Sequence, residues 1–426
     1  MHPSSLRLWL PLGLVFLSLG CRALPRDLGS LPGDQTQLAE VPVLKHLEAA
    51  SQVKGASAHE LVSQKKWTFE SAPDPSAYIQ ARAAEAASLP PLEQSVDLSV
   101  LTYNVAWLDF KILWKTYQSP RLADRRAAIV AGLFGEHDVV MVQEAWAWTD
   151  AQMLGEAAEA AGYAWYAGTP DRHSQHGLFV AVKLERIGRD QPLHGEEHTF
   201  FAQRQVEWFP GPKVRRGWLQ AHFELAGTGR TVHLVDLHAT SFPSFYRVRE
   251  LQARQVGQAL EAVGDDSVVL MGGDFNSGPF YVQDEWTHDN GKSSPGWWRN
   301  ATAWALWQHY GHVDDVQVLT GQAIDDVQRG KGVHPRPPDD FCQVGPGHTF
   351  SASDCNSLYK TQYGGTEYPA RLDFIFLGDP GQNVRVQNTG LRFVAPVDVG
   401  VGEPVEWSDH YGFEAMLKVR AEGGVE

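Results

Sequence analysis

Two polar residues, Asp274 and Asn276, follow a run of apolar residues with the composition of a buried strand. Gly272 and Gly273 interrupt that run, so the two polar side chains emerge two residues apart, on the same side of an extended chain. A carboxylate can hold a hard cation or polarise a water molecule, and a carboxamide can donate to a phosphate oxygen. The pair suits phosphoryl transfer, although in isolation it is also typical of an Asx-type turn.

Further polar clusters lie at the ends of other predicted strands: Thr102-Tyr103-Asn104, Gln143-Glu144, Asp236-Leu237-His238, Arg371-Leu372-Asp373 and Ser408-Asp409-His410. Most of them have an ordinary structural interpretation when taken singly. Asn104 could be a turn residue, Glu144 a solvated strand end, and His238 a satisfied core histidine. Asp373 is different, because it interrupts an apolar strand, where burying a charge without a partner is costly.

From residue 96 the apolar pattern predicts alternating strands and helices. Strands are expected at 98–107, 138–143, 163–167, 177–183, 217–225, 231–238, 268–274, 371–377, 384–393 and 410–419. Helices are expected at 121–134, from a cap at Thr149-Asp150 to 161, and at 246–263. The predicted helices lie early in the domain, paired strands lie in the middle, and strands lie at the end. This order favours an α/β protein with two packed sheets and outer helices over a doubly wound sheet.

In this order the six polar clusters resemble the endonuclease/exonuclease/phosphatase superfamily, over residues 96–421. The resemblance implies a four-layered α/β-sandwich, with two packed mixed β-sheets flanked by helices, and cleavage of phosphate esters with a divalent cation. Three stretches are similar to the neutral sphingomyelinase branch: Gln143-Glu144-Ala145-Trp146, Arg371-Leu372-Asp373-Phe374 and Ser408-Asp409-His410-Tyr411. Departures at Tyr103–Trp107 and at His176 leave the substrate open.

The same resemblance implies roles for the polar residues. Glu144 would be the principal ligand of Mg²⁺, or alternatively of Mn²⁺ or another divalent cation, with Asn104 and Asp409 on the metal side. His410 would be the general base, and Asp373 would accept its other ring proton. The remaining catalytic residues would orient water and phosphate or stabilise charge near the leaving group: Asp274, Asn276 and His238.

The N-terminal part predicts export. Residues 1–21 have a positive charge at Arg7, a short apolar run and a terminal Gly20-Cys21, which resembles a bacterial lipobox with Cys21 as the lipidated residue. The alternatives are lipidation and plain cleavage, so the mature chain would be secreted or a membrane-anchored lipoprotein of the bacterial envelope. Residues 22–95 read as a linker with an N-terminal helical extension, in which 38–50 and 77–87 have weak helical patterns.

Three features outside the polar clusters also bear on function. In an oxidising compartment Cys342 and Cys355 are expected to form a disulfide. Trp297 and Trp298 lie in a turn-rich stretch, where an interfacial role at a lipid surface competes with burial, whereas Trp304 and Trp307 have the spacing of a core-facing helical stripe. The basic run 213–216 could steer an anionic group, although a solvated hairpin tip is the simpler interpretation.

These observations predict an exported, Mg²⁺-dependent phosphodiesterase that hydrolyses sphingomyelin to ceramide and phosphocholine at a membrane surface, with no protein partner implied. The rivals are a nuclease that cleaves DNA or RNA on the same fold and a catalytically silent surface-binding module. A formal net charge of -15 and a pI of about 5.6 give no support to a polyanionic substrate.

Overall fold

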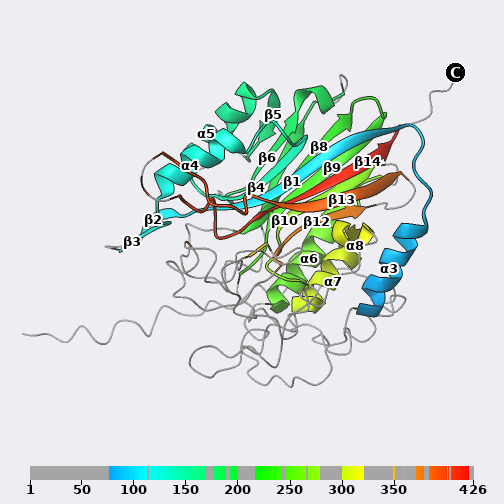
Figure 1. Ribbon diagram of the computed structural model, residues 1–426. Coiled ribbons are helices and arrows are strands. Elements are labelled where there is room, and N and C mark those ends of the chain that lie inside the picture. Colours follow the sequence, from blue (N-terminus) through cyan, green and yellow to red (C-terminus); the bar gives the residue numbers. More distant parts are fainter. Residues whose placement is uncertain are drawn as a thin grey trace, which may run out of the picture.

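The computed structural model describes residues 76–112, 115–168, 176–188, 192–199, 216–241, 246–264, 267–278, 300–320, 349–350, 358, 371–378, 383–400, 402 and 404–421. These residues form two six-stranded sheets that pack face to face, with helices outside them (Figure 1). A small separate hairpin joins β2 (Asp109–Ile112) to β3 (Lys115–Gln118). None of the described helices is long and apolar enough to cross a bilayer.

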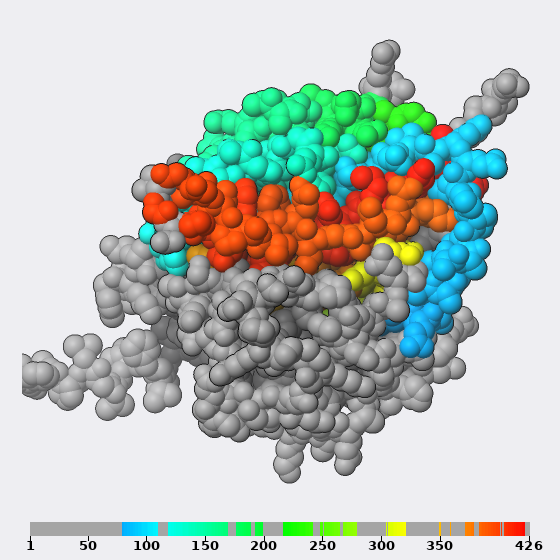
Figure 2. All heavy atoms as spheres, in the orientation of Figure 1, coloured from blue at the N-terminus to red at the C-terminus, as the bar shows by residue number. Residues whose placement is uncertain are grey.

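The first sheet has the strand order β13-β14-β1-β4-β6-β5. Its strands are β1 (Ser95–Trp107), β4 (Val139–Ala145), β5 (Tyr163–Tyr166), β6 (Phe179–Lys183), β13 (Val384–Arg392) and β14 (Gly412–Arg420). The pair β1 and β4 is parallel, and the other neighbours are antiparallel. In Figure 2 the band formed by β13 and the following segment crosses the middle of the face shown, in orange.

The second sheet has the strand order β11-β12-β10-β9-β8-β7. Its strands are β7 (His194–Thr199), β8 (Gly217–Leu225), β9 (Arg230–His238), β10 (Val268–Asp274), β11 (Val313–Asp315) and β12 (Asp373–Gly378). Here β9 and β10 are parallel and the remaining pairs are antiparallel. Each sheet therefore places one parallel pair among its central strands, and four of the six polar clusters lie at the carboxyl ends of those strands, whereas Asp373 opens β12 and Ser408–His410 precede β14.

Alternation along the strands divides the apolar residues between the layers. Val268 and Leu270 of β10 belong to the core between the two sheets, while Met271 belongs to the core on the outer side. In β1, Leu98 and Val100 face the central core, and the residues on the outer face pack beneath helices. The central strands β1, β4 and β10 are thus buried on two faces, which explains their near-continuous apolar runs.

Helices cover the outer face of each sheet. The helices α4 (Leu122–Gly132) and α5 (Trp148–Ala160) pack on the first sheet, and α3 (Ser76–Ser88), α6 (Tyr246–Leu260) and α7 (Asn300–Gly311) pack on the second. The short helix α8 (Val316–Leu319) and the 3-10 turn η3 (Leu184–Arg186) complete the described elements. The result is the four-layered α/β-sandwich that the sequence resemblance implied.

Most predicted elements are confirmed within a few residues, including the helix now seen as α3. Trp304 and Trp307 lie on α7 and are buried, so the helical stripe is confirmed, whereas the edge strand β7 and the β2–β3 hairpin were not predicted. The predicted cap at Thr149-Asp150 was misplaced, because both residues lie in the first turn of α5. Asp150 accepts there from the backbone nitrogen of Ala147 at 3.2 Å.

Candidate active site between the sheets

The alternation that builds the central core also places the polar residues. Asn104 continues the inner face of β1, His238 that of β9, and Asp274 that of β10, because each lies an even number of residues from a central-core position. Asp373 stands directly opposite Asp274 in the antiparallel pair of β10 with β12, and His238 stands opposite Asp274 on the other side. Four residues far apart in sequence therefore meet at one end of the sandwich.

Asp274 is the centre of this cluster. Its Oδ2 accepts a hydrogen bond from Asn104 Nδ2 at 3.0 Å and lies 3.3 Å from His238 Nε2 and 3.9 Å from His410 Nε2. Its Oδ1 accepts from the backbone nitrogen of Asn276 at 2.9 Å. Burial raises the pKa of Asp274, but His238 and His410 lower it more, so the net pKa is below its usual range. Asp274 is thus ionised and held from several sides.

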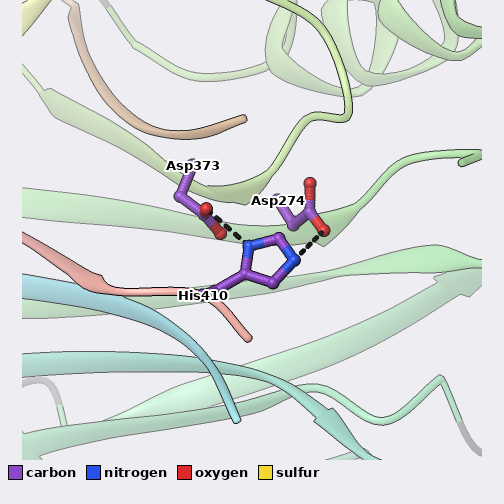
Figure 3. Close-up of side chains that lie close together, drawn as sticks. All are labelled: Asp274, Asp373 and His410. Atoms are coloured by element: carbon purple, nitrogen blue, oxygen red, sulfur yellow. Dashed lines mark hydrogen bonds and ion pairs between the residues drawn. The ribbon is translucent and has the colours of Figure 1, made fainter. Parts of the chain in front are cut away.

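His410 faces two carboxylates from the chain just before β14 (Figure 3). Its Nδ1 contacts Asp373 Oδ2 at 2.8 Å, an arrangement that leaves Nε2 directed at Asp274. Burial lowers the pKa of His410, but Asp373, Asp274 and Asp409 raise it more, to about 10. The imidazole is therefore protonated at neutral pH in this arrangement, and it can act as a base only when positive charge nearby offsets the carboxylates.

Thr349 forms hydrogen bonds with both segments that carry the Asp373–His410 pair. Thr349 Oγ1 accepts from the backbone nitrogens of Leu372 and Asp373, both at 3.0 Å. The carbonyl oxygen of Thr349 accepts from the backbone nitrogen of Tyr411 at 2.6 Å. Nothing in the sequence distinguishes Thr349 from other loop threonines, since its role exists only once β12 and the segment before β14 lie side by side.

Arg216 corrects one sequence interpretation. It ends the basic run that was interpreted as a solvated hairpin tip, but its side chain is buried and its guanidinium contacts the ring nitrogens of His238. The Arg216 guanidinium also lies 5.5 Å from the ring centroid of Trp146. The available sequence signal was its position immediately before the expected strand 217–225.

Glu144 reaches the site by leaving the strand geometry. Regular alternation after Val142 and Gln143 would turn Glu144 to the outer face, but its φ is 65°, in the left-handed region that is unfavourable for residues other than glycine. Glu144 Oε1 lies 3.7 Å from His238 Nε2. Backbone strain of this kind persists only where the surroundings enforce it, and it often marks a functional residue.

The oxygen donors near Glu144 fit a hard divalent cation. Its carboxylate makes one ion-pair contact with a described residue, at 3.7 Å from His238, and accepts no hydrogen bond from the described residues, so it can accept a cation. Asn104 is more committed, since Ala106 N donates to its Oδ1 at 3.0 Å and its Nδ2 donates to Asp274. The ligand atoms of Asp274, Asp373 and His410 also lie within 4.8 Å of one another, close enough for an ion, but Asp373 already pairs with His410 there.

The other predicted residues lie at the border of the cluster. The side-chain nitrogen of Asn276 donates to the carbonyl oxygen of Ala239 at 3.1 Å, and its backbone has a φ of 48°. Asp409 is buried, and its Oδ1 accepts from Ser408 Oγ at 3.3 Å. Asp409 and Glu144 both raise the pKa of the buried guanidinium of Arg125, although burial lowers it more. The two carboxylates therefore share a cationic neighbour.

A buried ion pair supports the strand that carries Asp373. Arg371 donates from Nη1 to Asp315 Oδ2 at 2.7 Å and from Nη2 to Asp315 Oδ1 at 2.6 Å. The guanidinium lies over the rings of Phe374 and Phe413, at 4.2 and 5.1 Å from their centroids. A bidentate pair of this kind fixes the direction of the backbone, so Arg371 and Asp315 help to hold Asp373 in place.

Several predicted functional residues lie outside the described part of the chain. These are Cys21 with the export segment 1–21, the two residues proposed to touch lipid, Trp297 and Trp298, and the expected disulfide partners Cys342 and Cys355. Their predicted roles stay predictions.

Comparison with known proteins places the chain in a family. The sequence profile described as "Endonuclease/Exonuclease/phosphatase family" matches residues 101–410, and the chain belongs to that family. Its members are phosphodiesterases and phosphatases that depend on divalent metal ions.

Individual relatives are more distant. A Drosophila melanogaster protein named "Putative neutral sphingomyelinase" is 27% identical over 197 residues, which are 43% of this chain and 40% of that protein. The chain thus matches less than half the length of this relative. Sphingomyelinase C from Streptomyces griseocarneus is 21% identical, with a TM-score of 0.47 over 75% of this chain and 99% of that one. D. rerio TDP2 in complex with a single-strand DNA product is also 21% identical, with a TM-score of 0.46 over 75% and 98%.

Proposed function

We propose that this chain is a divalent-cation-dependent phosphodiesterase that hydrolyses a phospholipid headgroup, with sphingomyelin as substrate and ceramide and phosphocholine as products. The observation that carries the proposal is the buried His410, whose Nδ1 is held by Asp373 while Nε2 faces Asp274. A base oriented by a carboxylate, with charged groups in front of it, is the arrangement that activation of water for attack on phosphorus requires.

The chain's own residues supply both sides of an in-line displacement. His410 would take the proton of the attacking water at Nε2, while Asp373 accepts from Nδ1 and stabilises the imidazolium that forms. His238, in contact with Arg216, would stabilise negative charge on the phosphoryl oxygens or near the leaving group. Asp274 and Asn276 would orient the water and the phosphate between the two histidines.

The cation we propose is Mg²⁺, held by Glu144 with Asn104 and Asp409. The reason is that Mg²⁺, a small hard ion, prefers oxygen ligands, whereas Zn²⁺ prefers nitrogen and sulfur ligands. When bound, the ion would offset the charge of the phosphate and its positive field would lower the pKa of His410 towards the range in which Nε2 accepts a proton.

Three features support a lipid substrate. The stretch Gln143–Trp146 and the closing Ser408–Tyr411 are similar to the sphingomyelinase branch, and the matching Drosophila melanogaster protein carries that name. The formal net charge of -15 disfavours a long polyanion. In addition, Trp297 and Trp298 could meet the headgroup zone of a bilayer.

The experiment is release of phosphocholine from sphingomyelin vesicles with Mg²⁺, beside nicking of plasmid DNA under the same conditions. We expect phosphocholine release that EDTA abolishes, and loss of turnover by roughly 10²-fold or more in His410→Ala. His309→Ala, which removes a half-buried histidine of α7, is the matched control and should retain full activity. Nicking without phosphocholine release would replace the lipid with nucleic acid, and full activity in His410→Ala would remove the general-base assignment.

We also propose export of the chain, with removal or lipidation of residues 1–21. Mass analysis of the mature N-terminus from the native host would show either acyl chains on Cys21 or a plain new N-terminus. An intact Met1 would contradict export.

A further inference from the structure

Three histidines stand side by side on the outer strands of the second sheet. His194 of the edge strand β7 is directly opposite His222 of β8, and His222 is directly opposite His233 of β9. Histidine makes up 17 of the 426 residues, so two consecutive cross-strand matches are not expected from composition. We call these three residues the histidine row.

The side chains of the histidine row are close together. The ring centroids of His194 and His222 are 5.2 Å apart, and those of His222 and His233 are 5.5 Å apart. His194 is exposed, while His222 and His233 are half-buried. None of the three imidazoles makes a hydrogen bond or an ion pair with another described residue, so their ring nitrogens remain available to a ligand.

The row lies on the opposite face of the sheet from the proposed active site. Ala221 and Phe223, on either side of His222, face the core between the sheets, as do Val232 and Leu234 on either side of His233. By alternation the histidines point outward, away from the cluster around Asp274. In Figure 1 the strands β8 and β9 run side by side, which places the row across neighbouring strands.

The chemistry of the row favours a borderline transition metal over Mg²⁺. Neutral imidazole nitrogen is a preferred ligand of Zn²⁺, Cu²⁺ and Ni²⁺, whereas Mg²⁺ prefers oxygen. Burial and the neighbouring His222 both lower the pKa of His233, which favours the neutral form of the ring that binds a metal. The ring nitrogens of the three residues do not all lie within 4.8 Å of one another in the structure, so binding of one ion by all three requires their side chains to change rotamer.

We propose that His222, together with His194 and His233, forms a second metal site on the outer face, which takes Zn²⁺ or a similar borderline divalent ion. His222 is the ligand shared by both neighbouring pairs. The bound ion links the edge strand β7 to β8 and β9, and it stabilises the folded chain because the unfolded chain does not hold the three rings together. The proposal is independent of the hydrolase assignment, since no residue is common to the two sites.

The test is calorimetric titration of tag-free protein with Zn²⁺ in the presence of excess Mg²⁺, together with the thermal midpoint. We expect one strong Zn²⁺ site in the wild type, and a rise of the thermal midpoint on adding Zn²⁺. His222→Asn should weaken binding by about tenfold or more, since loss of a ligand costs at least as much as loss of a residue that merely orients one. His309→Asn on α7 is the matched control and should bind like the wild type.

His194→Asn provides a second variant, because His194 is exposed on the edge strand and its replacement leaves the core untouched. It should also weaken binding, and the Zn²⁺-induced rise of the thermal midpoint should shrink in both variants. Wild-type affinity in His222→Asn and His194→Asn would overturn the proposal. Loss of the Zn²⁺ site in Glu144→Gln with no effect of His222→Asn would also overturn it, since it would assign the ion to the active-site cluster.

Discussion

Two neighbouring aspartates of β11 provide a test of how burial decides the energy of an ion pair. Asp315 pairs with Arg371, and their side chains are 0% and 4% exposed. Asp314 pairs with Arg82 of α3 at 2.5 Å, with side chains 14% and 25% exposed. Asp314 lies two residues before the start of α8, so its pair with Arg82 brings α3 close to α8. In Figure 2 the blue α3 lies on the right, close to the yellow segment that contains α8. The perturbation is Asp315→Ala, compared with Asp314→Ala.

The structure predicts very different costs for the two substitutions. Asp315→Ala leaves a guanidinium buried without its carboxylate, which costs about 3–5 kcal/mol. It also removes the cap of α8, where Asp315 Oδ1 accepts from Gln317 N at 3.0 Å, for about 1 kcal/mol more. Asp314→Ala leaves Arg82 with access to solvent and to Glu85, so the cost is about 0–1 kcal/mol.

The assay is urea denaturation of the two variants beside the wild type, with the free energy of unfolding extrapolated to zero denaturant. Phosphodiesterase turnover should fall in Asp315→Ala among molecules that remain folded, because Arg371 holds the start of the strand that carries Asp373. Equal losses of unfolding free energy in the two variants would refute the argument that burial decides the cost.

Two further substitutions test other parts of the fold. Gly273→Ala should destabilise the protein by about 2 kcal/mol or more, because Gly273 has a φ of 138° and an added Cβ would collide with the carbonyl oxygen of Leu237. Gly264→Ala is the control, since no atom lies near its added Cβ. It should be close to neutral in the same denaturation experiment. Burial raises the pKa of Asp138, but hydrogen bonds from Ser99 and Arg186, with the charge of Arg186, together lower it more, so its net pKa is below the usual value. The stabilising contribution of the Asp138 carboxylate is then complete above about pH 4 and is lost as the pH falls through its folded-state pKa. The loss of unfolding free energy in Asp138→Asn should therefore be greatest at pH 7 and smallest near about pH 3. A loss that does not change with pH would contradict this reasoning.

The strands and their polar ends were accessible from sequence, because a period of two and an apolar composition are local properties. The stretch Val268–Asp274 illustrates this, since its alternate residues do divide between the central and the outer core. The six polar clusters were likewise visible as short motifs, and their order indicated the family. The helix over 300–311 was missed apart from its tryptophan spacing, because the surrounding composition resembles a loop.

The contacts that turn these motifs into a site were decided by the tertiary structure. Asn104 and Asp274 are 170 positions apart, and their hydrogen bond exists only because two sheets pack with their inner faces together. The left-handed φ of Glu144 and the burial of Arg216 beside His238 depend on the same packing, so no local pattern reveals them.

The sequence by itself therefore determined which residues could do chemistry and, for Asn104, His238 and Asp274, the strand face on which they lie, since side-chain alternation is a property of the extended chain. The side of Glu144 was not determined in this way, because its φ of 65° departs from the strand geometry. The tertiary structure alone decided that Asp373 orients His410, that Asp274 stands before it, and that three histidines of separate strands form a row on the far face. The physical reason is that cross-strand register and sheet packing are set by the whole core at once, and no short segment contains that information.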